Sequence, residues 1–304
     1  MASGFATNEF LTFASHRSSK ASPGKIFQIH GDDSFPYLEL EKVYCGTPAN
    51  FIVTPICLSG PLSIDFEEFF SNKKLAKNSI QGGFIQSRCE AIPQADFVQF
   101  GDYCAYFDTR VNYRIPLSLN DEKYLSSLHR YSKYSIRKMM SSEADFSLLR
   151  VEGDEKKLEE FAGLYANTAT RVGFAPEYHF DLEDWRCLLA SRYWRLYLLY
   201  CDNSLIAGAV ICEVGSGYDY TFIGNDPDVK DSSRALLYFV RKELSKESSG
   251  HLDIGGGIEE GDSLAKFKQN MGGAPIPFVR CRFGHQGLFA NESEARVCLA
   301  QRWP

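Results

Sequence analysis

Apolar and polar residues alternate along this chain at two different periods. From residue 25 to residue 119 the apolar residues come in strand-length runs, with one helix-like stretch over 65–76, which predicts a mixed α and β region. From residue 120 onward, helical and strand periods follow one another in a definite order. The predicted order is a helix over 120–142, a strand over 146–151, helices over 155–171 and 182–191, strands over 195–200, 205–212 and 218–223, a helix over 232–246, a strand over 251–254, a helix that starts at 262 or 263, and a strand over 276–283. The three turn-linked strands predict an antiparallel β-meander.

The stretch from His251 to Gly273 carries the clearest chemical pattern. It reads as a short strand, a glycine-rich loop at 255–257, and a helix that Asp262 or Ser263 caps. Because glycine has no Cβ, we expect the amides of the loop and of the first helical turn to stay open. Such an arrangement suits a phosphate or a developing negative charge.

The helix in this stretch has two faces that the spacing defines. The apolar face, expected to pack on the core, consists of Leu264, Phe267 and Met271. Lys266 and Asn270 lie four residues apart on a second face, and Lys268 is expected to point elsewhere. Either lysine could hold a phosphate or carboxylate, and either could equally be an ordinary solvated surface residue.

The predicted helix over 120–142 is rich in cations. Its apolar stripe consists of Leu125, Leu128, Ile136 and Met139. Arg130, Lys133 and Arg137 lie together on another face, with Tyr131 and Tyr134 between them. This face could bind phosphates and stack on a base, or it could be a solvated helix surface with aromatic residues at its edge.

Composition and charge narrow the class of protein. The chain has 304 residues and a formal net charge of −6, so a nucleic-acid partner would have to bind a local basic patch. No apolar run approaches the roughly 20 residues of a membrane-spanning helix, and the start lacks a signal-peptide pattern, so we expect a cytoplasmic protein. The nine cysteines form no C-x-x-C pair and the six histidines show no metal spacing, which predicts reduced thiols and no metal site.

Several catalytic motifs are absent or incomplete. Ser263 and Lys266 match S-x-x-K, but the companion motifs of serine acylases are missing and Ser263 serves better as a helix cap. The glycines at 255–261 miss the dinucleotide pattern G-x-G-x-x-G by one residue, and no P-loop occurs. The chain therefore offers no convincing covalent nucleophile and no nucleotide fingerprint.

One family resemblance is carried by the same stretch. Asp253-x-Gly-Gly-Gly, followed by Asp262-Ser-Leu-x-x-Phe-Lys-x-x-x-Gly-Gly, resembles the strand, loop and helix of the FemAB-like branch of the GNAT (Gcn5-related) acyltransferase superfamily. The resemblance extends over roughly residues 120–283. One departure from the acyl-CoA enzymes of the superfamily is notable. Where they have a glycine-rich pyrophosphate loop, this chain reads Asn225-Asp-Pro-Asp-Val-Lys-Asp-Ser-Ser-Arg, which contains three aspartates.

The resemblance implies an α+β (mixed α/β) fold made of tandem GNAT-like subdomains, each a mixed, mostly antiparallel sheet flanked by helices. The expected domains are a reduced N-terminal subdomain at 1–119, a basic linking helix at 120–142 and an acyltransferase subdomain at 143–304. The implied activity is transfer of an aminoacyl or acyl group to an amine of a cell-wall precursor or amino sugar in a bacterium. The donor would be a co-substrate, either aminoacyl-tRNA or acyl-CoA, with no tightly bound cofactor. The alternative is a non-catalytic protein that uses the same fold to bind a ligand.

The candidate site residues follow from the motif and from the predicted strand order. The proposed catalytic residues are Asp253, Tyr220 and Lys268. The proposed substrate-binding residues are Asp219, Asn225, Gly255, Gly256, Gly257, Lys266, Asn270, Arg130, Lys133 and Arg137. Asp253 would orient an amine, Tyr220 would protonate the leaving group, and the resemblance matches Lys268 to the lysine of the family's Phe-Lys pair. Charged tRNA would bind the basic helix, while Glu259 and Glu260 are further candidate bases.

Overall fold

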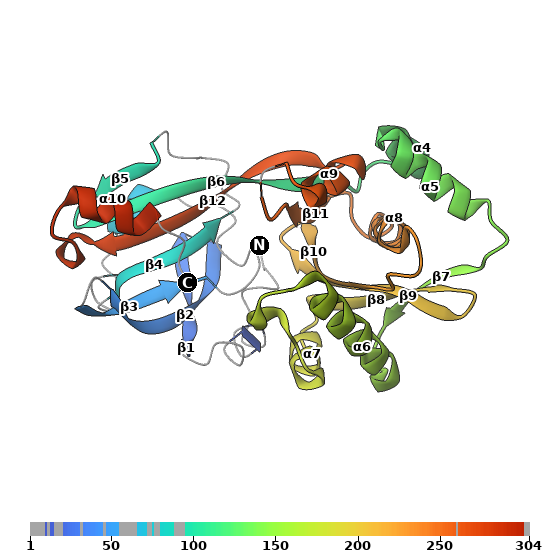
Figure 1. Ribbon diagram of the computed structural model, residues 1–304, viewed down its shortest axis with the longest axis horizontal. Helices are drawn as coiled ribbons and strands as arrows, with labels where there is room; N and C mark the ends of the chain where they lie inside the picture. The colour runs from blue at the N-terminus through green and yellow to red at the C-terminus, as the bar shows by residue number, and fades with distance from the viewer. Residues whose placement is uncertain are drawn as a thin grey trace. The chain divides into compact units, whose positions relative to one another are not determined.

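The computed structural model of the protein describes residues 10, 13–14, 21–30, 33–44, 47–54, 66–71, 75, 80–87, 95–259 and 261–300 (Figure 1). The chain divides into two compact units. One, here called the central unit, contains residues 111–276, and the other, the flanking unit, contains the described residues of 5–110 and 277–304. The helical region after residue 120 thus belongs to the central unit, and the described residues after 276 group with the N-terminal part, unlike the division expected from the sequence.

The flanking unit is built on strands β1 (Ala21–His30), β2 (Asp33–Tyr44), β3 (Thr47–Val53), β4 (Ile80–Ser87) and the later part of β12 (Ala274–His285). Neighbouring strands pair in that order, and all pairs are antiparallel except β3 with β4. Strand β5 (Phe97–Phe100) pairs with the start of β6 (Tyr103–Pro116), and helices α2 (Phe66–Ser71) and α10 (Glu292–Ala300) belong to this unit. Its core is aromatic, with Phe69, Phe70 and Tyr103 in contact with Phe283.

The central unit contains the predicted meander. Strands β7 (Phe146–Val151), β8 (Trp194–Cys201), β9 (Ser204–Val214) and β10 (Gly217–Asn225) pair antiparallel in sequence order. Strand β11 (His251–Gly256) joins β10 in parallel, and the end of β6 pairs antiparallel with β11. The meander turns are tight because Asp202, Asn203 and Gly215 adopt positive φ values of 50°, 64° and 60°.

Helices cover both faces of the central sheet (Figure 1). Helices α6 (Glu155–Val172) and α7 (Leu182–Leu189), joined through the short 3-10 helix η1 (Pro176–Tyr178), lie on one face. Helices α8 (Ser232–Leu244) and α9 (Ser263–Asn270) lie on the other, where α8 also contacts α5 (Arg130–Met140). The predicted mixed fold with a mostly antiparallel sheet flanked by helices is confirmed.

The predicted helix over 120–142 is in fact two helices, α4 (Asp121–Ser127) and α5. The break lies at Leu128, whose backbone is extended, and at His129, which caps the second helix. No proline or glycine causes it. The backbone N–H of His129 instead donates to the carbonyl oxygen of Asn270 at 3.0 Å, so a tertiary contact with the end of α9 replaces a helical hydrogen bond.

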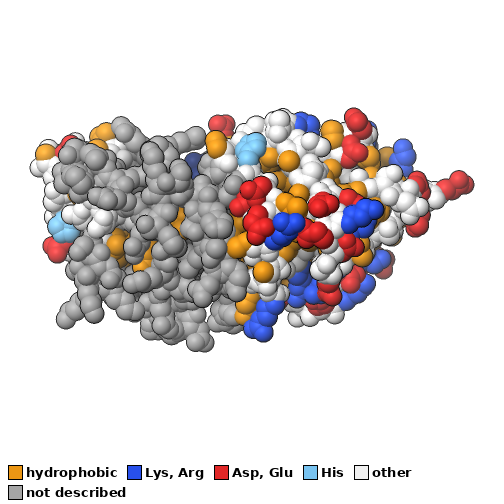
Figure 2. All heavy atoms as spheres, turned by 90° about the horizontal axis from the view of Figure 1, so that it is seen from below, with side chains coloured by type: hydrophobic (Ala, Val, Ile, Leu, Met, Phe, Trp, Pro, Cys, Tyr) orange, Lys and Arg blue, Asp and Glu red, His pale blue; other side chains and the backbone are white. Residues whose placement is uncertain are grey.

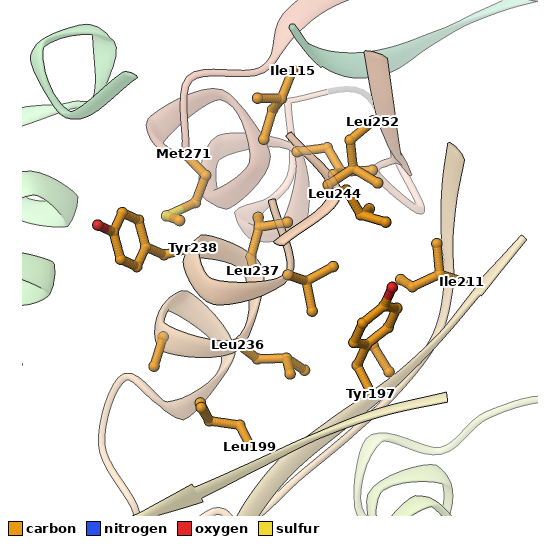
Figure 3. Close-up of a cluster of buried hydrophobic side chains, with 14 of the residues drawn as sticks. Ile115, Tyr197, Leu199, Ile211, Leu236, Leu237, Tyr238, Leu244, Leu252 and Met271 are labelled. Atoms are coloured by element: carbon orange, nitrogen blue, oxygen red, sulfur yellow. The ribbon is translucent and has the colours of Figure 1, made fainter. Parts of the chain in front are cut away.

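A single apolar cluster fills the space between the central sheet and helices α4, α5, α8 and α9 (Figure 3). Its completely or almost completely buried members include Ile115, Tyr124, Leu236, Leu252 and Met271. Burying one such side chain contributes about 1.5–3 kcal/mol, so this cluster fixes the helices on the sheet. The interior also contains the fully buried Arg241, which donates to Asp121 at 3.0 Å and lies 4.6 Å from the ring of Tyr124.

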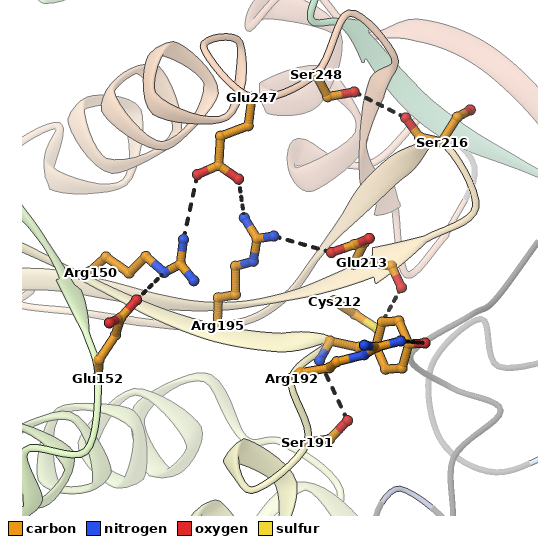
Figure 4. A network of polar contacts seen from close by, with 11 residues as sticks. Arg150, Glu152, Ser191, Arg192, Arg195, Cys212, Glu213, Ser216, Glu247 and Ser248 are labelled. Carbon is orange, nitrogen blue, oxygen red and sulfur yellow. Dashed lines mark hydrogen bonds and ion pairs between the residues drawn. The ribbon is translucent and has the colours of Figure 1, made fainter.

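Ion pairs tie the central meander to the end of α8 (Figure 4). The Arg195 guanidinium contacts Glu213 at 3.1 Å and Glu247 at 2.5 Å, and Glu247 also contacts Arg150 at 3.5 Å. Because these side chains form ion pairs with one another, the network stabilises the fold without offering a free binding group. Acidic and basic side chains also intermingle on the face of the described surface that Figure 2 shows.

Two predictions from composition are tested by the described residues. None of their helices is long and apolar enough to cross a membrane. Their cysteines are free thiols, as predicted, and Cys104, Cys212 and Cys281 are buried. Cys45, Cys57 and Cys89 lie outside the described residues.

Candidate active site

Strands β10 and β11 separate at their carboxyl ends. They pair in parallel at Tyr218 with Leu252 and at Asp219 with Asp253, and the ladder stops there. Beyond that point β10 stays paired with β9, while β11 stays paired with β6 at Gly256. Ligands of sheets with parallel strands characteristically bind where neighbouring strands diverge at their carboxyl ends. We call this region the strand fork.

Lys268 reaches the end of the β11 arm of the fork. Helix α9 places it on the same side as Ala265 and Met271, which are 4% and 0% exposed. Its Nζ donates a hydrogen bond of 2.6 Å to the carbonyl oxygen of Gly256. Burial lowers the pKa of Lys268 from 10.5 to about 8, and the nearby Asp262 carboxylate only partly opposes this effect. Lys268 was expected to point elsewhere than Lys266 and Asn270, and the structure places it on the side of the buried Met271.

Gly255 makes room for this lysine. Its φ is +74°, and the register between β11 and β6 shifts between Asp253 and Gly256, so the backbone bulges here. A Cβ at position 255 would lie 2.8 Å from Nζ of Lys268 and 3.9 Å from Oδ1 of Asn112. That Oδ1 atom is buried and has no hydrogen-bond partner among the described residues. An amine and an unsatisfied polar atom thus converge over one glycine.

Three amides that follow the glycines are not open as expected, because Asp262 occupies them. Its carboxylate accepts from Ala265 N at 2.7 Å, Ile258 N at 2.7 Å and Glu259 N at 3.1 Å. These backbone hydrogen bonds, that of Ala265 foremost, lower the pKa of Asp262. A Cβ at Gly257 would lie 2.5 Å from Oδ1 of Asp262, so this glycine serves close packing. Asp262 therefore holds the loop in shape, leaving Lys268 as the donor at this end of the site.

Asp253 does not face an open groove, contrary to expectation. It is 3% exposed, and its two oxygens accept from Nε and Nη2 of Arg114 at 2.8 and 3.2 Å. Nε2 of His251 lies 3.8 Å away. The neighbouring Asp219, opposite Asp253 on β10, is also buried. A carboxylate held in this way fixes β6 on β11 and is a poor acceptor for a substrate amine.

Tyr220 lies on the β10 arm of the fork, but its hydroxyl points into the interior. The ring packs against the central core cluster, and the hydroxyl has no hydrogen-bond partner among the described residues. Burial raises the pKa of Tyr220, so the phenol stays protonated. The nearby Tyr124 hydroxyl donates to the carbonyl of Met271 at 3.0 Å. The structure thus places Tyr220 in the core. Core packing is the alternative to a role as proton donor.

Three other predicted binding residues lie apart from Lys268 or serve the fold. The Asn225 side chain accepts from Arg171 at 3.0 Å, and its backbone N–H donates to Thr168, which ties β10 to α6. Lys266 is exposed on the outer side of α9. The Asn270 carbonyl oxygen accepts from the His129 N–H at the start of α5. Of the additional candidate bases, Glu259 is exposed and Glu260 lies outside the described residues.

The predicted cationic residues of α5 do come together. Their shared face lines a surface depression of about 570 Å³, here called the cationic groove, formed by Arg130, Lys133, Tyr134, Arg137, Lys138 and Ser141. None of its four cations forms an ion pair within the part of the chain that the structure describes. Tyr134 is 63% exposed, so a flat ring is presented among the positive charges. Phosphates with an adjoining base match this arrangement.

Sequence reasoning missed Asn112 and Arg114. Both lie on β6, where alternate polar residues in an otherwise strand-like run give a weak sign of a polar strand face. Nothing local shows that this face meets Asp253, which lies 139 residues further along. The residues described here include no group of three histidine, cysteine or acidic side chains that could hold a metal ion.

Comparison with solved structures first identifies the class of fold. Neither a family model nor a curated protein sequence matches the chain. Solved structures do match, and the predicted likeness to the fold of FemAB-like proteins is confirmed by the structure of FemX. The crystal structure of FemX is similar over 90% of this chain and 91% of its own, with a TM-score of 0.63 and 14% identity.

Two further solved structures have the same fold. The structure of L-PGS from Bacillus licheniformis matches over 96% of this chain and 93% of its own, with a TM-score of 0.57 and 10% identity. The C-terminal domain (DUF2156) of a putative lysylphosphatidylglycerol synthetase from Agrobacterium fabrum matches over 95% and 90%, with a TM-score of 0.56 and 10% identity. At such identities the likeness concerns the fold.

Proposed function

We propose that the protein is an N-acyltransferase whose reaction takes place at the strand fork beside Lys268. The observation that carries this proposal is the Lys268 amine, held 2.6 Å from the Gly256 carbonyl oxygen at the end of a diverging strand, where burial lowers its pKa. Lysines that merely solubilise a surface are not desolvated in this way. The fold shared with FemX supports the same class of reaction.

The chemistry assigns Lys268 the role of an oxyanion donor. The acceptor amine attacks the acyl carbonyl carbon, and the carbonyl oxygen gains negative charge. At a pH below its pKa of about 8, Lys268 is mostly the ammonium form, which uses one N–H on Gly256 and keeps two for this oxygen. The bond from carbon to the leaving oxygen or sulfur then breaks with its electron pair, and the amine gives up its proton to the leaving group or solvent. No covalent nucleophile is needed.

The charges around α8 favour aminoacyl-tRNA over acyl-CoA as the donor. Asp226, Asp228 and Asp231 precede the helix N-terminus, where they would repel a pyrophosphate. The cationic groove on α5 offers unpaired charges for a phosphate backbone instead. It begins where His129 meets Asn270 at the end of the helix that carries Lys268. The acceptor would be an amine of a cell-wall peptide precursor or of an amino sugar in the bacterial cytoplasm, and the protein would need no tightly bound cofactor.

A transfer assay tests the proposal. The purified protein is incubated with charged tRNA or acyl-CoA and with a panel of peptide precursors and amino-sugar nucleotides, and products are identified by mass spectrometry. We expect an amide product with wild-type protein and a loss of about 10²–10³ in turnover for Lys268→Met. The control is Lys156→Met, the same change at an exposed position of α6. Absence of product across both donor classes would refute the proposal.

A second candidate is a ligand-binding protein without catalysis. The occupied carboxylate of Asp253 favours it, because the residue expected to orient the acceptor amine is engaged with Arg114. The Lys268→Met variant separates the two. An enzyme loses turnover while it keeps most of its affinity for the donor, whereas a binding protein has no turnover to lose and shows only the weaker affinity.

A further inference from the structure

Arg234, in the first turn of α8, lies where three helices meet. Its guanidinium is 4.9 Å from the ring centroid of Tyr131 on α5 and 5.4 Å from that of Phe267 on α9. Each distance is within the range of a cation–π contact. Arg234 therefore bridges the helix that bears the cationic groove and the helix that bears Lys268. Phe267 directly precedes Lys268 in the chain.

Asp231 stabilises this arrangement through two side-chain contacts. Its carboxylate accepts from the Ser135 hydroxyl at 2.7 Å and also pairs with Nη1 of Arg234. Asp231 does this with a φ of +64°, a left-handed conformation that is strained for a non-glycine residue. The two contacts offset that strain, because they fix α5 on α8 through Ser135 and orient the arginine. Nε of Arg234 is buried and has no hydrogen-bond partner among the described residues.

The three helices are thus joined at two points. At one point the rings of Tyr131 and Phe267 contact the same guanidinium. At the other, His129 N–H at the start of α5 donates to the Asn270 carbonyl at the end of α9. Tyr131 directly follows Arg130, one of the groove cations, so a ligand that fixes the groove also fixes this ring.

We propose that Arg234 is a positioning residue that couples occupancy of the cationic groove to the placement of Lys268. A polyanion in the groove immobilises α5 and with it Tyr131, the guanidinium stays between the two rings, and Phe267 holds Lys268 against Gly256. The lysine, already held at Gly256 without a ligand, is then shielded more completely when a donor is present. The catalytic meaning of this coupling rests on the proposed function, but the coupling itself can be measured without turnover.

The test measures how fast an amine-reactive reagent labels Lys268 at pH 8, by mass spectrometry, with and without a single-stranded oligonucleotide of about 12 nucleotides. In the wild type we expect the oligonucleotide to slow labelling about threefold or more. In Arg234→Ala, labelling without oligonucleotide should be faster, and the oligonucleotide should still bind but no longer slow it. That residual binding also excludes simple blocking of the reagent. Arg234→Lys, which keeps the charge near Asp231 and both rings, should restore part of the effect.

Tyr131→Leu provides a second variant in case Arg234→Ala unfolds, because Tyr131 is 45% exposed and its loss leaves the Asp231 contacts in place. It should uncouple labelling from the oligonucleotide in the same way. Binding to wild-type protein with no change in Lys268 labelling would overturn the coupling while leaving the groove intact. Persistence of the full effect in both variants would overturn it as well. Failure of the oligonucleotide to bind wild type would instead refute the groove itself, and the inference with it.

Discussion

Replacing Lys268 by methionine should change the pH dependence of stability in a way that no exposed lysine can. Methionine has a similar length and no charge, so the apolar contacts with Ala265 and Met271 can persist. The fold lowers the pKa of Lys268 from 10.5 to about 8, which means that the folded protein disfavours the ammonium form. This preference lowers the free energy of unfolding at every pH at which the unfolded chain would carry the proton.

The magnitude follows from the two pKa values. Below pH 8 both forms of wild-type protein carry the proton, and the folded form bears the full penalty, which corresponds to about 3 kcal/mol. Between about pH 8 and 10.5 the unfolded chain binds more protons, so the stability of wild type rises with pH. Losing the hydrogen bond to Gly256 costs the variant about 1–3 kcal/mol at every pH. The stability of Lys268→Met relative to wild type should therefore fall by about 2–3 kcal/mol from pH 7 to pH 10.

Urea unfolding of both proteins at pH 7, 8, 9 and 10 measures this difference. Groups other than Lys268 titrate in both and cancel. Lys156→Met, at an exposed position, should show a difference from wild type that stays flat within about 0.5 kcal/mol. A flat difference for Lys268→Met as well would show that the lysine is not desolvated, and the assignment of the oxyanion donor would fall.

Three further results are expected. Gly255→Ala should destabilise the protein by about 1–2 kcal/mol in urea unfolding and lower transfer, because φ is +74° and the new Cβ would displace Nζ of Lys268. Arg114→Ala should lower the free energy of unfolding by about 2–3 kcal/mol, which is less than for a fully buried ion pair because Arg114 is 27% exposed. A folded variant with unchanged stability would refute the pairing with Asp253. Turnover of wild type, corrected for ionisation of the acceptor amine, should fall as pH rises through about 8, where Lys268 loses its proton; a rise there would make it a base instead.

The order of elements could be predicted from sequence because each has a clear local period. The meander of β8, β9 and β10 and the strand, loop and helix after residue 251 were all anticipated. The inward face of α9 was not. Leu264 was assigned to the inward face but is 39% exposed. Ala265 and Met271 point inward instead, as does Lys268, which lies between them in the sequence. Lysine is treated as polar when a helix is searched for apolar periodicity. A functional lysine on the buried side therefore interrupts the predicted apolar face.

The other errors arise from contacts that are distant in sequence. Asp253 was expected at a rim because it ends a strand, but its partner Arg114 comes from β6, and only the register of the two strands brings them together. The break between α4 and α5 has no local sign, since it depends on the carbonyl of Asn270. The cationic face of α5 was predicted correctly because residues three and four apart share a helix face whatever the rest of the fold does.

The most direct test of the central claim is a crystal structure with a non-hydrolysable analogue of the aminoacyl-tRNA acceptor end. We expect the acyl carbonyl oxygen to lie about 3 Å from Nζ of Lys268, beside Gly255 at the strand fork. An analogue bound with its carbonyl far from this lysine, and with Lys268 still engaged only with Gly256, would contradict it.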